Sequence, residues 1–157
     1  KIFNKNPLEM RNPHLSTEWR QFRLNAVTSL VNEIIDIANS KNKKVTAAVF
    51  PFPEMSRQMV RQAWNDWNLD SASPMLYQNI YRENINWIGF ATRQGVSDVE
   101  FPIHSGLYAG ALKKPGDFEK AINISKTNGA SGISIFTADG LNDEQKSVLV
   151  KLKNSSN

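Results

Sequence analysis

The chain has 157 residues, of which 40% are hydrophobic and 22% are charged, which is an ordinary globular composition. It contains no cysteine, and this excludes disulfides, zinc–thiolate sites and a thiol nucleophile. The net charge is +4, from 19 basic and 15 acidic residues. These residues are scattered, so we interpret them as a mixed solvated surface and expect no nucleic acid partner. No run of about 18 apolar residues occurs, so no membrane span is expected.

A loop and a long helix are predicted before the first strand. Residues 1–15 are rich in asparagine and proline, which is typical of loop. The helix is expected to begin at Ser16 or Thr17, either of which can cap it, and to end near Asn39. Its apolar residues recur at i, i+3, i+4 and i+7, which predicts one buried stripe. The stripe comprises Trp19, Phe22, Ala26, Val27, Leu30, Val31, Ile34 and Ala38, widened by Ile35 and Ile37.

Four short apolar runs predict four strands, at residues 45–50, 72–77, 103–108 and 132–137. Their starts lie 27, 31 and 29 residues apart. A strand, a crossover helix and the return to a parallel strand need about 30 residues, so the spacing favours parallel βα units. The intervening helices are expected at about 56–67, 79–93 and 117–127, with a last helix capped by Asn142.

The pattern predicts an α/β fold that is half of a (β/α)8 TIM barrel, with four parallel βα units preceded by a long helix. A complete barrel needs roughly 200 to 250 residues. A Rossmann-like sheet is the competing solution, but no G-x-G-x-x-G occurs. We expect a single domain over residues 1–157, with loop at 1–15, the helix and βα units at 16–153, and a polar tail at 154–157. The first strand is apolar on both faces, which predicts burial on both sides.

The ends of the predicted strands supply the candidate functional residues. In barrels, catalytic and binding side chains lie at the carboxyl ends of the strands and in the loops that follow. This rule selects Glu54 and Arg57 after the first strand, Tyr77, Gln78 and Tyr81 after the second, and His104 and Tyr108 around the third.

Glu54 is the only carboxylate directly beyond a strand end in the first three units. It is a candidate general acid, because hydrolysis of a glycosidic bond needs a carboxyl group as proton donor. Position alone favours a loop carboxylate that pairs with Arg57, an anion at a helix start, or both.

The other candidates also leave alternatives open. His104 can be a hydrogen-bonding group in a pocket, a packed structural residue or, least favoured, a metal ligand. No His, Asp and Glu spacing indicates a metal, so we expect no metal and no other cofactor. Tyr77 and Tyr108 fit either stacking on sugar rings or core packing. Ser105 lacks a G-x-S-x-G context, so a serine nucleophile is not expected.

Residues 16–140 resemble the barrel of bacterial family 10-like glycosyl hydrolases. Three segments carry the resemblance: the W-R-x-F-R helix start at residues 19–23, the tryptophan-containing stretch 62–67 followed by an L-D turn, and a P-M-x-Y strand. Residues 130–136 are similar to the closing strand of that family. The P-M-x-Y element, here Pro74, Met75 and Tyr77, is the most specific of these.

The resemblance implies a TIM barrel that acts on polysaccharide or cell-wall glycan. In that family an acidic L-D-Y-type element precedes the W-R-x-F-R helix, and this chain has none. The element would lie upstream of Lys1, so the resemblance implies the C-terminal half of the barrel. Glu54 then stands where related barrels place the acid/base carboxylate, and Tyr77 lines the cleft.

Hydrolysis of glycosidic bonds is therefore the first hypothesis, with this chain as part of the enzyme. Glu54 would donate the proton, and Arg57, Tyr77, Gln78, Tyr81, His104 and Tyr108 would bind sugar. The alternatives are a non-catalytic carbohydrate-binding half-barrel and a structural fragment that dimerises through its open edges. The expected partners are carbohydrate and either the missing N-terminal half-barrel or a second copy of the chain. The resemblance implies an extracytoplasmic location, and the start at Lys1 leads us to expect that any targeting segment lies upstream.

Overall fold

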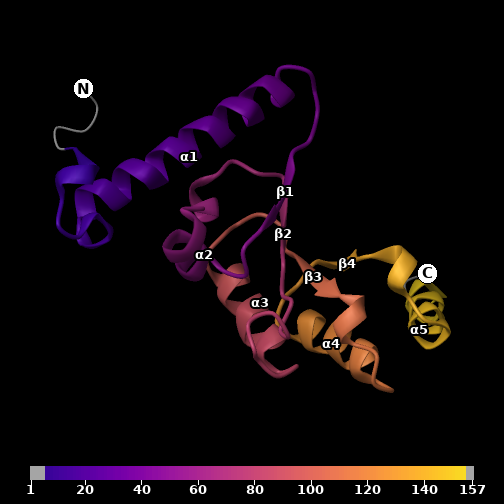
Figure 1. The fold of residues 1–157 in the computed structure, drawn as a ribbon. Coiled ribbons are helices and arrows are strands. Elements are labelled where there is room, and N and C mark those ends of the chain that lie inside the picture. The colour runs from indigo at the N-terminus through magenta and orange to yellow at the C-terminus, as the bar shows by residue number, and fades with distance from the viewer. Residues whose placement is uncertain (1–5, 155–157) are drawn as a thin grey trace.

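The structure is a computed structural model that describes residues 6–154. Five α-helices are described in this range: α1 (Thr17–Asn39), α2 (Pro53–Val60), α3 (Trp87–Ser97), α4 (Asp117–Thr127) and α5 (Asp143–Asn154). The four strands are β1 (Thr46–Val49), β2 (Ser71–Pro74), β3 (His104–Tyr108) and β4 (Gly132–Phe136). Figure 1 shows the helices and strands in chain order.

The four strands are parallel and lie in the order of the chain. β1 pairs with β2, with Thr46 opposite Ser71, and β3 pairs with β4, with Tyr108 opposite Phe136. Between these two small sheets, β2 meets β3 through two isolated parallel bridges, Ala72–Ile103 and Met75–Gly106. The prediction of an α/β chain with parallel strands after a long helix is therefore confirmed.

The strands have one covered face and one open face. Side chains alternate between the two faces of a strand. The covered face holds Val49, Ala72, Leu76, Ile103 and Leu107, all buried. On the open face, Thr46, Ala48, Ser134 and Phe136 are exposed, and Ser71, Ser73, Met75, His104 and Tyr108 are half-buried.

The expectation that β1 is buried on both sides is wrong for this reason. Thr46 and Ala48 of β1 are exposed, whereas Val49 is buried. The described helices pack their apolar residues against the covered face alone. One cluster joins Ile35 of α1 to Val49 and Ile103, together with Trp64 and Trp67. A second cluster joins Leu76 and Leu107 to α3, α4 and α5 through Ile88, Phe118, Ile122 and Val148.

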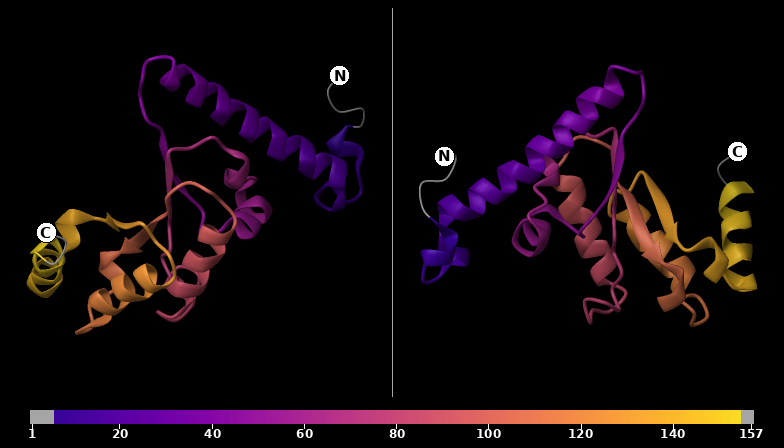
Figure 2. Two further views of the ribbon diagram at one scale, coloured as in Figure 1. Left: turned by 180° about the vertical axis from the view of Figure 1, so that it is seen from behind. Right: turned by 45° about the horizontal axis from the view of Figure 1, so that its top comes forward.

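Helix α1 is less buried than its apolar stripe predicts. Ser16 caps it as expected, because its Oγ accepts a hydrogen bond from the Trp19 amide at 3.2 Å. Of its residues only Ile35 is buried, and Leu30, Ile34 and Ile37 are 59%, 52% and 55% exposed. Val27, Val31 and Ile35 pack on the neighbouring cluster and leave the rest of the stripe open. Figures 1 and 2 show that α1 also slants away from the strands.

Helices α2 (Pro53–Val60) and α3 (Trp87–Ser97) differ at both ends from the predicted ranges 56–67 and 79–93. Helix α2 ends at Val60 rather than near 67, because Arg61 takes a left-handed conformation with φ of 64°. Helix α3 begins at Trp87 rather than near 79. The intervening residues form turns, in which Arg82 has φ of 59° and the Asn84 side chain accepts a hydrogen bond from the Asn86 amide at 2.9 Å. Such side-chain bonds stabilise turns in competition with helix.

The last two helices follow the prediction closely. Helix α4 ends before Gly129, whose φ of 95° suits a residue without a side chain. Asn142 caps α5 by accepting from the Gln145 amide at 2.8 Å, and the Gln145 side chain accepts in return from the Asn142 amide at 3.0 Å. Asn154 is the last residue of α5, and the rest of the expected tail lies outside the described residues, as does the start of the expected loop.

Candidate functional site

Three aromatic rings meet at the carboxyl ends of β2, β3 and β4. The ring centroids of Tyr77 and Tyr108 are 5.7 Å apart, and those of Tyr108 and Phe136 are 5.9 Å apart. Tyr77 and Phe136 are stacked at 5.8 Å with an interplanar angle of 23°. We call Tyr77, Tyr108 and Phe136 the aromatic rim.

The strand register brings these three rings together. Tyr108 and Phe136 are the last residues of β3 and β4 and stand opposite each other. Tyr77 follows β2 by three residues and reaches the same edge. Phe136 is 54% exposed although it is large and apolar, so the rim presents ring surface to solvent rather than completing a core. The peptide bond between Phe136 and Thr137 is cis.

Tyr81 and Gln78 adjoin the rim, as the sequence predicts for residues near the end of β2. Burial raises the pKa of Tyr77, and burial followed by the nearby Tyr77 charge raises the pKa of Tyr81. Both therefore remain neutral hydrogen-bonding phenols at physiological pH. The Tyr81 ring is 5.2 Å from that of Trp87, which extends the aromatic surface. Gln78 is buried, and its Oε1 has no hydrogen-bond partner among residues 6–154.

His104 lies on the open face but at the other end of β3. It is the first residue of that strand, four residues before Tyr108, which corresponds to about 13 Å at the rise of a strand. The imidazole lies over Gly132, where a Cβ atom would approach the histidine Cδ2 to 2.8 Å. Gly132 thus leaves room for His104 on the open face, and the two ends of β3 hold different candidate groups.

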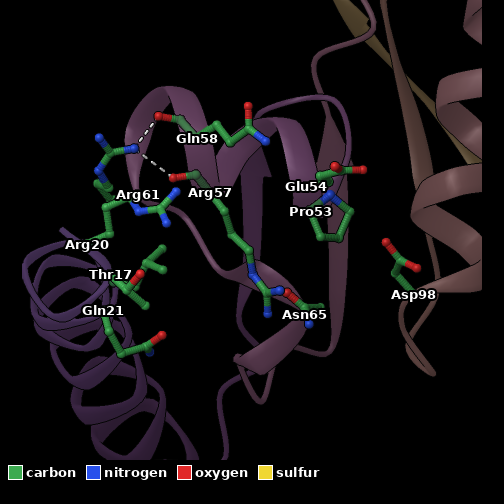
Figure 3. A pocket seen from close by; sticks show the side chains of 11 residues that line it. Thr17, Arg20, Gln21, Pro53, Glu54, Arg57, Gln58, Arg61, Asn65 and Asp98 are labelled. Carbon is green, nitrogen blue, oxygen red and sulfur yellow. Dashed lines mark hydrogen bonds between the residues drawn. The ribbon is translucent and has the colours of Figure 1, made fainter. Parts of the chain in front are cut away.

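Glu54 and Arg57 lie apart from the rim. Both line a cavity of about 410 Å³ between α1 and α2, to which Arg20, Arg61 and Asp98 also contribute (Figure 3). None of the other predicted site residues lines this cavity. The separation follows from the short connection after β1, since α2 begins at Pro53 and Glu54 falls in its first turn.

The Arg57 guanidinium is already engaged in this cavity. Its Nη2 lies 3.2 Å from Asp66 Oδ2 and 3.3 Å from Oδ1, with both side chains partly exposed. The pairing of Glu54 with Arg57 that position alone allowed is not formed: no ion pair or hydrogen bond joins them in the described structure.

Sequence reasoning missed Phe136, Arg20 and Arg61. The first was interpreted as an apolar strand residue, although its place at the end of the fourth strand is equivalent to that of Tyr108 at the end of the third. No local signal marks Arg20 and Arg61, which come to one cavity only because α1 and the end of α2 both line it.

Within residues 6–154, no three His, Asp or Glu side chains gather closely enough to hold a metal ion. No described helix has the length and apolar character needed to cross a bilayer. Comparisons with family models, with curated proteins and with solved structures found no match for this chain.

Proposed function

We propose that this chain is the C-terminal half of a (β/α)8 barrel and binds a glycan at its aromatic rim. The parent activity that we propose is hydrolysis of glycosidic bonds in a polysaccharide or cell-wall glycan. Such a substrate lies outside the cytoplasm, so the proposal includes an extracytoplasmic location.

The aromatic rim is the observation that carries the proposal. Aromatic rings offer flat apolar faces to the C–H groups of a sugar, and the Tyr77 and Tyr108 hydroxyls can hydrogen-bond to sugar hydroxyls. The rim lies at the carboxyl ends of parallel strands, where barrel enzymes bind their substrates.

The open face supports a half-barrel. In a closed barrel, one face of every strand points inward and the helices cover the other. The four parallel strands follow this plan on the covered face. Their open face, and the outer edges of β1 and β4, have no partner strand within residues 6–154. A second set of strands, from an N-terminal half, would cover the face and pair with both edges.

Glu54 is the proton donor that we propose for hydrolysis in the completed barrel. The resemblance to family 10-like glycosyl hydrolases supports this role, whereas the distance of Glu54 from the rim does not. Replacing Glu54 by glutamine, in a barrel completed with an added N-terminal half, should lower turnover by about 10²–10⁴-fold. Unchanged turnover would remove Glu54 from the mechanism and leave rim binding untouched.

The binding proposal is tested by Phe136→Ala, with Phe90→Ala as the matched control. Phe90 lies on α3 and is 43% exposed, so the control removes a comparable exposed ring. Calorimetric titration with hexasaccharides of β-1,4-glucan, β-1,4-xylan and chitin should find at least one that binds. Loss of one stacking ring should weaken that binding about tenfold, a loss of about 1.4 kcal/mol, whereas Phe90→Ala should bind normally. Equal affinity in the two variants would contradict the rim as the binding site.

A structural fragment that dimerises is the second candidate. The open strand edges of β1 and β4 favour it, because unpaired edges expose main-chain donors and acceptors. The exposed residues Leu30, Ile34 and Ile37 on α1 add apolar surface. Sedimentation equilibrium over a wide concentration range separates the two candidates, since self-association without any glycan binding would favour this one.

A further inference from the structure

The cavity between α1 and α2 has opposite charges at its two ends. Figure 3 shows the guanidinium groups of Arg20 and Arg61 together at one end, and the carboxylates of Glu54 and Asp98 toward the other. At about 410 Å³ the cavity is within the range of small-molecule sites.

The arginine end is not neutralised by the side chains that the structure describes. Arg57, the third arginine of the cavity, is paired with Asp66, but no acidic side chain within residues 6–154 pairs with Arg20 or Arg61. Burial first, and then the charges of Arg23 and Arg20, lower the pKa of Arg61 below its usual range. The Nε of Arg61 is shielded from solvent and has no hydrogen-bond partner in this part of the chain. Like charges held together in this way cost free energy.

The backbone fixes Arg61 in this position. Its left-handed conformation ends α2, and its side chain turns back so that Nη1 donates to the main-chain oxygens of Arg57, at 2.9 Å, and of Gln58. A left-handed conformation is uncommon for a residue with a side chain. The guanidinium therefore cannot swing freely into solvent, away from Arg20, without breaking these bonds.

We propose that the arginine end of this cavity binds a small oxyanion, as a phosphate, a sulfate or a carboxylate group. Guanidinium groups match the planar or tetrahedral oxygens of such anions. Arg20 can donate two parallel hydrogen bonds, and Arg61, whose Nη1 is engaged with main-chain oxygens, can donate from Nη2. The carboxylates of Glu54 and Asp98 at the far end disfavour an extended polyanion, so the ligand is compact. This inference does not depend on the glycan proposal.

The test compares thermal unfolding midpoints in sodium phosphate, sodium sulfate and sodium chloride at equal ionic strength. Low millimolar concentrations keep the general stabilising effect of phosphate and sulfate small. In the wild-type protein, phosphate or sulfate should raise the midpoint above its value in chloride, with saturation as one site fills. Arg20→Gln should abolish this difference, and Arg20→Lys should keep part of it. Arg20 is exposed, so these variants should fold.

Arg11→Gln is the matched control, because Arg11 is exposed, lies outside the cavity and carries the same charge. It should keep the full difference between phosphate and chloride. A further arm with sodium glucuronate distinguishes a carboxylate carried by a sugar from a free inorganic anion. If none of phosphate, sulfate and glucuronate exceeds chloride, or if Arg20→Gln responds like Arg11→Gln, the proposed site is wrong.

Discussion

The two faces of the strands are formed by alternate residues of the same short segments, yet they differ in burial and in polarity. The covered face is apolar and packed by helices, with Val49, Ala72 and Leu107 fully buried. The open face carries small and polar residues along its length and aromatic rings at one end. The covered face therefore holds the chain together, whereas the open face is left uncovered by the helices that the structure describes.

The largest contrast between the faces should appear in stability. Leu107→Ala removes a fully buried side chain from the covered face and should lower the free energy of unfolding by about 2–5 kcal/mol. Ser134 lies on the neighbouring strand but on the open face. Ser134→Ala should therefore change the free energy of unfolding by less than about 0.5 kcal/mol. Urea denaturation measures both. Similar losses in the two variants would show that the open face is also packed.

Gly106 limits the contrast between the faces, because the main chain of β2 crowds the open face at this position. A Cβ atom there would lie 2.5 Å from the main-chain oxygen of Pro74, where β2 meets β3. Gly106→Ala should therefore force the strands apart and cost about 1–3 kcal/mol. Gly140→Ala is the control, since the nearest atom there, Thr137 Oγ1, lies at 3.8 Å and leaves room. Equal denaturation midpoints for the two variants would mean that β2 and β3 are not in close contact.

The covered face also contains one buried pair of hydroxyl groups, which tests whether its packing depends on hydrogen bonding as well as on apolar contact. Thr92 Oγ1 of α3 and Ser105 Oγ of β3 are buried and 2.9 Å apart, which makes Ser105 a packed residue and not an accessible nucleophile. Thr92→Val should leave the Ser105 hydroxyl unpaired and cost about 1–3 kcal/mol. Adding Ser105→Ala should recover much of this loss. A double variant that is as unstable as the sum of the single variants would contradict the pairing.

The smallest effect concerns the phenols near the rim. The raised pKa values of Tyr77 and Tyr81 mean that the folded chain holds these protons more tightly than the unfolded chain. The resulting stability is fully present below the unfolded pKa of about 10 and is lost as the pH rises through the folded values. Tyr77→Phe should lower the pKa of Tyr81, because it removes a neighbouring negative charge. Phenolate absorbance checks this, and an unchanged Tyr81 titration would count against their proximity.

The strands were the most predictable elements. Their apolar runs and constant spacing gave four parallel strands within a few residues of their observed bounds, because both signals are local. The sequence of β1 did not show that one of its two faces is left uncovered. Thr46 and Ala48 occur in an apolar run, and no property of the run itself tells whether another element packs on them.

The ends of the helices were predictable where a side chain caps them, and less predictable where a turn forms in place of a helical segment. Ser16 and Asn142 cap as expected, whereas the left-handed Arg61 and the turn around Arg82 carry no glycine to mark them. The apolar stripe of α1 was visible in the sequence, but periodicity shows only that a stripe exists. Whether Ile34 is covered depends on what lies beside it.

The candidate site was predictable in part, by the rule that strand ends meet at one edge. This rule correctly placed Tyr77 beside Tyr108. The rule wrongly placed Glu54 with these two tyrosines. Helix α2 begins only a few residues after β1, and its first turn directs the Glu54 side chain into the cavity between α1 and α2. Such long-range packing cannot be obtained from residue spacing alone.

The most direct test of the glycan binding that we propose for the aromatic rim is a nuclear magnetic resonance titration that follows the ring protons of Tyr77, Tyr108 and Phe136. The chain would be titrated with the same three hexasaccharides. We predict shifts that are concentrated on these three rings and saturate with at least one sugar. Shifts absent from all three rings with every sugar, or confined to Phe52 and Phe90, would contradict the account.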